Sequence, residues 1–126
     1  MSKMSEKMQK KLDKRRLEKM VKISIETSKE KKAEHIVVLD LREASSFTDY
    51  FVIMQGNSKR QNTAIYESIE RELKKENVKP LSIEGRENAE WILMDCGYFI
   101  IHIFSKEARE YYYLEKLWGD APRADY

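Results

Sequence analysis

Alternation of apolar and polar positions is clearest in residues 91–104, WILMDCGYFIIHIF, where it predicts a β-hairpin. Two runs rich in β-branched and aromatic residues flank Cys96 and Gly97, and a glycine provides the positive φ of a tight turn. A two-residue turn defines the cross-strand pairs, which are expected to be Asp95 with Tyr98, Leu93 with Ile100, and Trp91 with His102.

The two faces of this hairpin differ in chemistry because successive side chains of a strand point in opposite directions. One face is purely apolar and calls for a helix to cover it: Ile92, Met94, Phe99, Ile101 and Ile103. The other face carries Trp91, Asp95, Tyr98 and His102, and tryptophan and tyrosine are enriched at protein interfaces. This second face is either a binding surface or a second core layer in which the polar groups pair internally.

Upstream of the hairpin, apolar spacing predicts a helix from Leu17 to about Lys32 and two buried strands. The strands are residues 35–41, HIVVLDL, and residues 49–56, DYFVIMQG. The segment between them is too short for a crossover helix, so the strands are expected to pair antiparallel.

A second helix is predicted to begin after Ser58, which forms a capping box with Gln61, and to end near Asn77. A short strand, residues 80–84, follows it before Gly85. Ser105 is expected to cap one last helix over residues 106–118. On this helix, Tyr111, Leu114 and Trp118 are predicted to form one stripe.

This order, αββαβββα, predicts an α/β fold with a five-stranded mixed sheet and flanking helices. The chain has 126 residues, which is the size of one domain. We expect a basic, flexible extension over residues 1–16 and a single domain over residues 17–126.

Charge is unevenly distributed. Residues 1–32 hold 12 Lys and Arg against 5 acidic residues, net +7, and residues 33–126 hold 12 against 17, net −5. An acidic body favours a basic protein partner, and contact of the basic amino terminus with RNA is the alternative. Neither a membrane-length apolar run nor a secretory signal is found, so we expect no membrane partner and a cytoplasmic location.

A strand followed by Gly56, Asn57, Ser58 and a helix is similar to the phosphate-binding turn of nucleotidyltransferases. Those enzymes also need carboxylates that converge on Mg²⁺, commonly two on one strand separated by one residue. No such pair follows Ser58, and Asp95 is alone on its strand. The two histidines lack metal-ligand spacing. We therefore expect no catalytic residue, metal or cofactor.

Four segments together resemble the ribosomal silencing factor family, also called Iojap-related proteins: DYFVIMQGNSKRQ, PLSIEG, AEWILMDCGYFIIHIF and EAREYYYLEKLWGDAPR. The resemblance covers residues 17–126. It implies a nucleotidyltransferase-like fold without catalysis and a protein that binds the large ribosomal subunit through its fourteenth protein. Such a factor blocks joining of the small subunit and so represses translation.

The resemblance places the contact surface on the open sheet face and the carboxyl-terminal segment. The expected partner-binding residues are Trp91, Asp95, Tyr98, His102, Tyr112, Leu114, Glu115, Trp118 and Asp120. Trp91 and Trp118 are expected to be aromatic anchors, His102 and Tyr112 to form hydrogen bonds, and the three carboxylates to face basic residues. Tyr111 and Leu117 are expected to pack the last helix onto the sheet.

Two other functions stay open at the level of sequence. One is an active enzyme of the nucleotidyltransferase fold, which requires Mg²⁺-dependent nucleotide binding. The other is an RNA-binding protein of ribosome assembly, whose affinity would fall steeply with salt. Because the predicted surface is aromatic and exposed, a homodimer is a further possibility.

Overall fold

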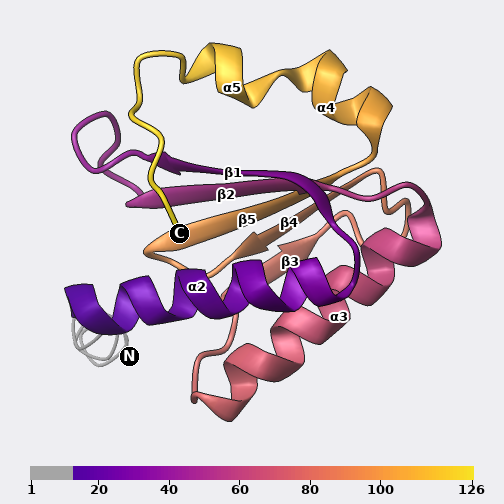
Figure 1. Ribbon diagram of the computed structural model, residues 1–126, viewed down its shortest axis with the longest axis horizontal. Helices are drawn as coiled ribbons and strands as arrows, with labels where there is room; N and C mark the ends of the chain where they lie inside the picture. The colour runs from indigo at the N-terminus through magenta and orange to yellow at the C-terminus, as the bar shows by residue number, and fades with distance from the viewer. Residues whose placement is uncertain (1–12) are drawn as a thin grey trace.

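The computed structural model describes residues 13–126 as a five-stranded sheet between two helical layers (Figure 1). Helices α2 and α3 lie below the sheet, and α4 and α5 lie above it. The elements are α2 (Lys14–Glu30), β1 (Glu34–Asp40), β2 (Tyr50–Gln55), α3 (Lys59–Lys75), β3 (Ser82–Glu84), β4 (Trp91–Asp95), β5 (Phe99–Phe104), α4 (Lys106–Tyr112) and α5 (Leu114–Leu117). The predicted order and mixed α/β class are confirmed, except that the last helix is divided in two.

The sheet has the order β1-β2-β5-β4-β3, in which only β2 and β5 are parallel neighbours. The predicted antiparallel pairing of β1 with β2 is confirmed. β2 is buried along its whole length, as predicted, because it is flanked by strands and covered by helices on both faces. β1 is an edge strand, and its first residues, Glu34 and His35, are exposed.

Helices α2 and α3 cover the lower face of the sheet and bury the main core. Apolar residues spaced three to four apart face the strands, and five of them are fully buried: Met20, Val21, Ile65, Ile69 and Leu73. Opposite them lie the five hairpin residues for which a helical cover was predicted: Ile92, Met94, Phe99, Ile101 and Ile103. That prediction is confirmed.

Helix α2 begins three residues earlier than predicted, at Lys14, because the Asp13 carboxylate accepts a hydrogen bond from the Arg16 amide and caps the helix. Arg16 also donates from its guanidinium to the Glu76 carbonyl at the end of α3. Residues 13–16 are therefore part of the folded unit. The rest of the predicted extension, residues 1–12, lies outside the described residues.

The start of α3 confirms the predicted cap with one change of partner. The Ser58 hydroxyl accepts from the Gln61 amide at 3.0 Å, and the Gln61 Oε1 accepts from the Asn57 amide, rather than that of Ser58, at 2.7 Å. The Gln61 Nε2 also donates to the carbonyls of Lys31 and Lys32, each at 3.0 Å. One side chain thus joins the start of α3 to the end of α2.

The hairpin register differs from the prediction by two residues. The observed pairs include Trp91 with Phe104, Leu93 with His102, and Asp95 with Ile100. The cause is a longer turn, in which the Cys96 amide donates to the Phe99 carbonyl and the Asp95 carboxylate accepts from the Gly97 amide at 2.9 Å. A shift by an even number of residues keeps each strand residue on its predicted face. Tyr98 instead lies in the turn and packs toward the lower core.

The predicted single helix over residues 106–118 is wrong because the chain turns at Tyr113, whose φ of 45° is left-handed. The turn changes the direction of α5 relative to α4, so that Leu114 and Trp118 pack toward the sheet. Tyr111 and Leu117, expected to pack inward, are instead 81% and 73% exposed. The inward-facing positions predicted for one straight helix do not hold on both sides of a break in that helix.

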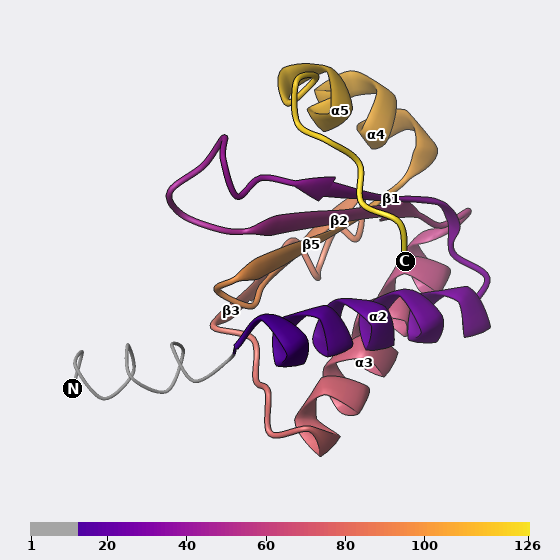
Figure 2. The same cartoon turned by 60° about the vertical axis from the view of Figure 1, so that its left-hand side comes forward.

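The last five residues, Pro122–Tyr126, form a C-terminal strap that crosses the edge strand β1 from the α5 layer toward α2 (Figure 2). The Asp40 amide donates to the Pro122 carbonyl, and the Ala124 amide donates to the Val38 carbonyl. The Tyr126 ring meets the Tyr50 ring edge-on, with centroids 6.3 Å apart. The strap thereby connects the two helical layers around one edge of the sheet.

Candidate partner-binding surface

Seven aromatic side chains form a continuous row across the upper layer. Neighbouring ring centroids lie 4.4–6.2 Å apart in the order Tyr111, Tyr112, Trp91, His102, Phe51, Trp118 and Phe47. Strands β2, β4 and β5 hold the centre of the row, and α4, the residue after α5 and the loop before β2 hold the rest. Such ring contacts stabilise a fixed arrangement beyond simple burial.

The centre of this row is buried and its ends are exposed. Phe51 and His102 are 5% and 3% exposed, whereas Phe47 and Tyr111 at the two ends are 59% and 81% exposed. We call the accessible part of the row, together with the exposed Leu117 at the end of α5, the aromatic surface: Phe47, Trp91, Tyr111, Tyr112, Leu117 and Trp118. Exposed aromatic side chains held by a buried base are typical of protein contact sites.

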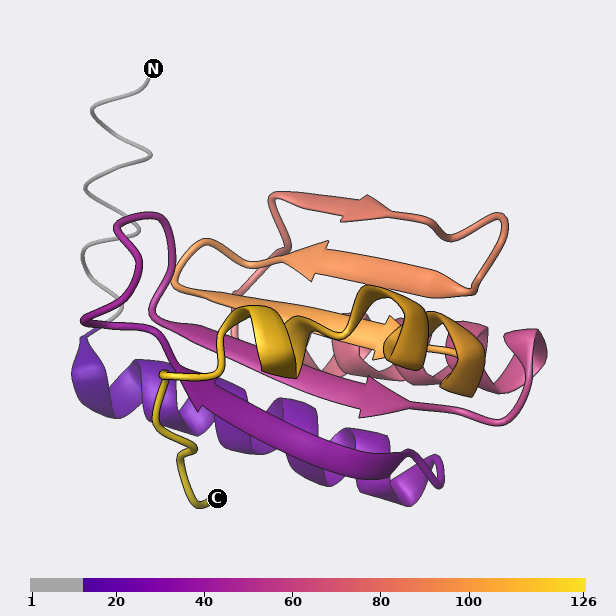
Figure 3. The ribbon, with the colours of Figure 1, turned by 90° about the horizontal axis from the view of Figure 1, so that it is seen from above.

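Seen from above, α4 and α5 run along β5 and β2, and none of the helices described for residues 13–126 lies over β3 or β4 (Figure 3). The expected open sheet face is therefore open only above β3 and β4. Trp91 and Asp95 on β4 are half-buried there, whereas His102 on β5 lies beneath the upper layer.

His102 is an internal residue in this conformation. Its Nδ1 accepts a hydrogen bond from the Trp91 Nε1 at 3.1 Å, which requires the neutral imidazole to carry its proton on Nε2. Burial lowers the pKa of His102 to about 3, because a charged imidazolium would lose its hydration among aromatic rings. Its position thus favours orienting Trp91 over touching a partner directly.

The three predicted carboxylates occupy different environments. Asp95 caps the hairpin turn, and Glu115 accepts from the Arg109 guanidinium at 3.2 Å. Asp120 is exposed. Asp120 is therefore the carboxylate most available to a basic partner.

Two other predicted site residues do not reach the aromatic surface. Tyr98 packs at the far end of the hairpin toward the lower core, and Leu114, the first residue of α5, is 8% exposed because it packs toward the sheet. Trp91, Tyr112 and Trp118 are brought to the surface as expected. The structure adds Phe47, Tyr111 and Leu117.

The exposure of Tyr111 could have been predicted from the sequence. Three consecutive tyrosines, Tyr111–Tyr113, cannot all face one side of a helix, so some of them had to be exposed. Phe47 had no such signal, because its position depends on how the loop over residues 41–49 folds back onto Trp118.

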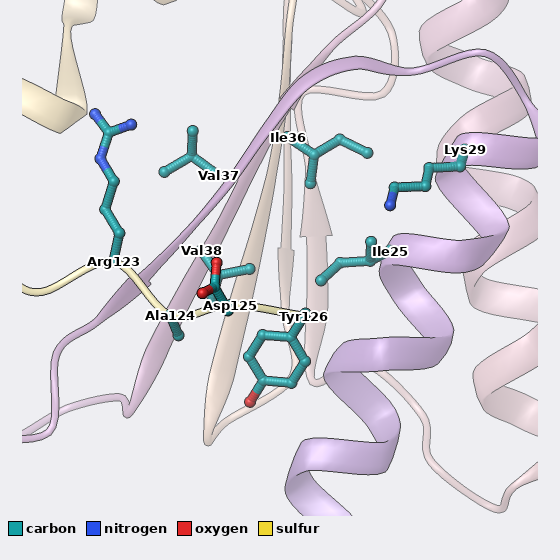
Figure 4. A pocket seen from close by; sticks show the side chains of 9 residues that line it. All are labelled: Ile25, Lys29, Ile36, Val37, Val38, Arg123, Ala124, Asp125 and Tyr126. Carbon is teal, nitrogen blue, oxygen red and sulfur yellow. The ribbon is translucent and has the colours of Figure 1, made fainter.

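Three hollows flank the upper layer and the strap. One of about 430 Å³ lies beside Trp91, Tyr111 and Tyr112 at the aromatic surface. A second, of about 220 Å³, lies between α2, β1 and the strap, and its lining includes Lys29 of α2 and Tyr126 of the strap (Figure 4). A third, of about 560 Å³, lies between β1, α4, α5 and the strap.

Within residues 13–126, no three His, Cys, Asp or Glu side chains come together in a way that could hold a metal ion. None of the helices described there is long and apolar enough to cross a membrane. The one cysteine, Cys96, is buried, and burial raises the pKa of its thiol to about 12.

Fold and site together define a three-layer α/β domain that presents an aromatic surface. Residues 14–126 match the family model described as "Ribosomal silencing factor during starvation". The chain is 42% identical to Ribosomal silencing factor RsfS of Bacillus subtilis over 106 residues, which cover 84% of this chain and 90% of that protein. The chain therefore belongs to the ribosomal silencing factor family.

More distant and structural relatives agree with this assignment. The mouse protein named "Mitochondrial assembly of ribosomal large subunit protein 1" is 34% identical, over 71% of this chain and 41% of its own length. A crystal structure from Chromobacterium violaceum has a TM-score of 0.79 at 32% identity and covers 81% of this chain and 85% of its own. Another crystal structure, from Bacillus halodurans, has a TM-score of 0.77 at 33% identity and covers 86% of this chain and 99% of its own.

Proposed function

We propose that this protein binds the large ribosomal subunit through its fourteenth protein and prevents the small subunit from joining. Membership of the ribosomal silencing factor family supports the general role. The observation that supports this contact site is the aromatic surface, whose exposed side chains pack on the buried rings of Phe51 and His102. The site of action would be the cytoplasm, where subunits join.

Occlusion requires no reaction and no cofactor. A specific interface buries upwards of about 1,000 Å² in total, and a body bound over a joining surface excludes the other subunit sterically. We place Trp91, Tyr112 and Trp118 at this interface with Phe47, Tyr111 and Leu117, and Asp120 at its rim. Residues 33–126, which hold the sheet, α3 and the upper helical layer but not the basic helix α2, carry a net charge of −5, which suits a basic partner.

The test is co-sedimentation with separated ribosomal subunits, followed by addition of small subunits to measure joining. Wild-type protein is expected to migrate with large subunits and to reduce the fraction of joined ribosomes. The variant Tyr111→Ser with Leu117→Ser removes two exposed apolar side chains and should weaken binding at least tenfold, which corresponds to about 1.4 kcal/mol or more. Its melting temperature should stay near that of wild type.

Leu81→Ser is the matched control, because Leu81 is 61% exposed but precedes the edge strand β3 and is not part of the aromatic surface. It should bind subunits as wild type does. Equal binding by the double variant, or an equal loss with Leu81→Ser, would refute the assigned surface. A homodimer through the same surface would compete with the subunit, so sedimentation is repeated at several protein concentrations.

A further inference from the structure

The largest of the three hollows lies outside the aromatic surface. It has a volume of about 560 Å³ and opens between the edge strand β1, helices α4 and α5, and the C-terminal strap. Small-molecule sites in proteins commonly have volumes of about 300–1,000 Å³. This cavity is therefore large enough for an organic ligand.

A buried cation forms part of its wall. Arg109 is 8% exposed, and its Nε donates to the Glu115 carboxylate while its Nη1 donates to Gln55 Oε1 at 3.3 Å. Within residues 13–126, Nη2 donates no hydrogen bond, yet it is not among the buried atoms that lack a partner. Nε and Nη1 are engaged by two different acceptors and Arg109 lines the cavity, so Nη2 is the nitrogen that remains for a ligand.

Two further cations line the same cavity. Lys106 and Arg123 form no ion pair with a carboxylate of residues 13–126. Figure 4 shows the Arg123 side chain pointing away from Tyr126 and the smaller cavity, toward the upper helical layer. The strap thus directs Arg123 to the side on which Lys106 and Arg109 lie.

Charge in the cavity is opposite in sign to that of the surrounding domain. Its lining includes Lys106, Arg109 and Arg123 against Glu110 and Glu115, and Glu115 is already paired with Arg109. One positive charge is left in excess, although residues 33–126 as a whole are net negative. A guanidinium and an ammonium converging on one cavity favour a phosphate group.

The rest of the wall suits a flat organic ring. Val37 of β1 and Tyr113 line the cavity, and Tyr113 is 51% exposed because the left-handed turn between α4 and α5 lifts it from the core. A base can stack on an aromatic side chain whatever its identity, because every base has a π-face. A bare phosphate would leave this part of the volume unused.

We propose that this cavity binds a mononucleotide, with the phosphate at Lys106, Arg109 and Arg123 and the base against Tyr113 and Val37. None of these residues belongs to the aromatic surface. Nucleotide binding in this cavity therefore does not depend on subunit binding at the aromatic surface.

Calorimetric titration of the full chain with 5′-AMP, 5′-GMP, adenosine and inorganic phosphate tests it. At least one nucleotide should bind with a Kd below about 1 mM, and adenosine and inorganic phosphate should each bind at least about tenfold more weakly. Lys106→Ala and Arg123→Ala should each weaken nucleotide binding about tenfold, the usual effect of losing a charge-assisted hydrogen bond. Tyr113→Ala should reduce the advantage of the nucleotide over phosphate.

Lys116→Ala is the matched control, because Lys116 is an exposed lysine of α5 that does not line the cavity. It should bind nucleotide as wild type does. Absence of nucleotide binding, phosphate binding as tight as nucleotide binding, or an equal loss with Lys116→Ala would each overturn the proposal. Melting curves of all variants establish that they are folded.

Discussion

At the scale of single residues, the centre of the aromatic row determines how its exposed ends are presented. His102 is buried between Phe51 and Trp91 and accepts the Trp91 indole N–H. An imidazole in this place can accept that hydrogen bond only in its neutral form. The orientation of Trp91 at the surface is thereby connected to the protonation state of a core residue.

The buried imidazole predicts that stability falls as the solution becomes acidic. The pKa of His102 is lowered to about 3 in the folded protein from an ordinary value of 6.5, so between these values only the unfolded chain binds the extra proton. Stability is therefore greatest above pH 6.5 and falls toward pH 3. Between pH 7 and pH 5 the free energy of unfolding should decrease by about 2 kcal/mol from this group.

Urea unfolding at the two pH values measures the effect. In His102→Gln, whose side chain amide can still accept from Trp91, the difference between pH 7 and pH 5 should shrink markedly. His35→Gln removes an exposed histidine and is the control. If His102→Gln retains the full difference, another group causes it.

At the scale of elements, local capping determines where α3 and α4 begin, and tertiary packing determines where the last predicted helix is divided. Helix α3 forms where its sequence predicts, because Ser58 and Gln61 satisfy amides at its start. The segment after Ser105 also begins where predicted, with the Ser105 hydroxyl accepting from Ala108. Its division at Tyr113 is a tertiary effect, since α5 has only four residues and would not form alone.

Loss of the α3 cap is expected to destabilise the whole domain. Ser58→Ala removes the acceptor of the Gln61 amide and should lower the free energy of unfolding by about 1 kcal/mol. Chemical denaturation measures this change. Ser46→Ala, in an exposed loop position, should have almost no effect. Equal stability of the two variants would show that the cap contributes nothing.

At the scale of the whole molecule, the strap joins the two helical layers around the β1 edge of the sheet. It crosses the β1 edge, pairs with Val38 and Asp40, and places Tyr126 against Tyr50. It also covers part of an edge strand, whose unpaired backbone groups would otherwise be open to other chains. The strap therefore stabilises the domain and restricts access to one edge of the sheet.

Removing the strap is expected to lower both stability and solubility. A chain ending at Pro122 loses the Ala124 hydrogen bond and the Tyr126 ring contact, which together should cost about 2 kcal/mol. Thermal denaturation and light scattering measure the two effects. Tyr126→Phe keeps the ring and should stay close to wild type. A truncated chain as stable as the full one would contradict this role of the strap.

Sequence alone determined the elements whose signals are local. The period-two strands, the capped start of α3 and the alternation of the hairpin faces follow from the preferences of adjacent residues, and each was confirmed. Motifs spread along the chain were also sufficient to predict the family. Trp91, Tyr112 and Trp118 were predicted at the contact face, and the structure brings them to the aromatic surface.

Only the tertiary structure decided the features that depend on distant segments meeting. The hairpin register depends on the hydrogen bonds of a particular turn, and the break at Tyr113 depends on how α5 docks on the sheet. Whether His102 is buried and Tyr111 exposed depends on that docking as well. Periodicity specifies which side chains share a face of a regular element, but burial is determined by what covers that face.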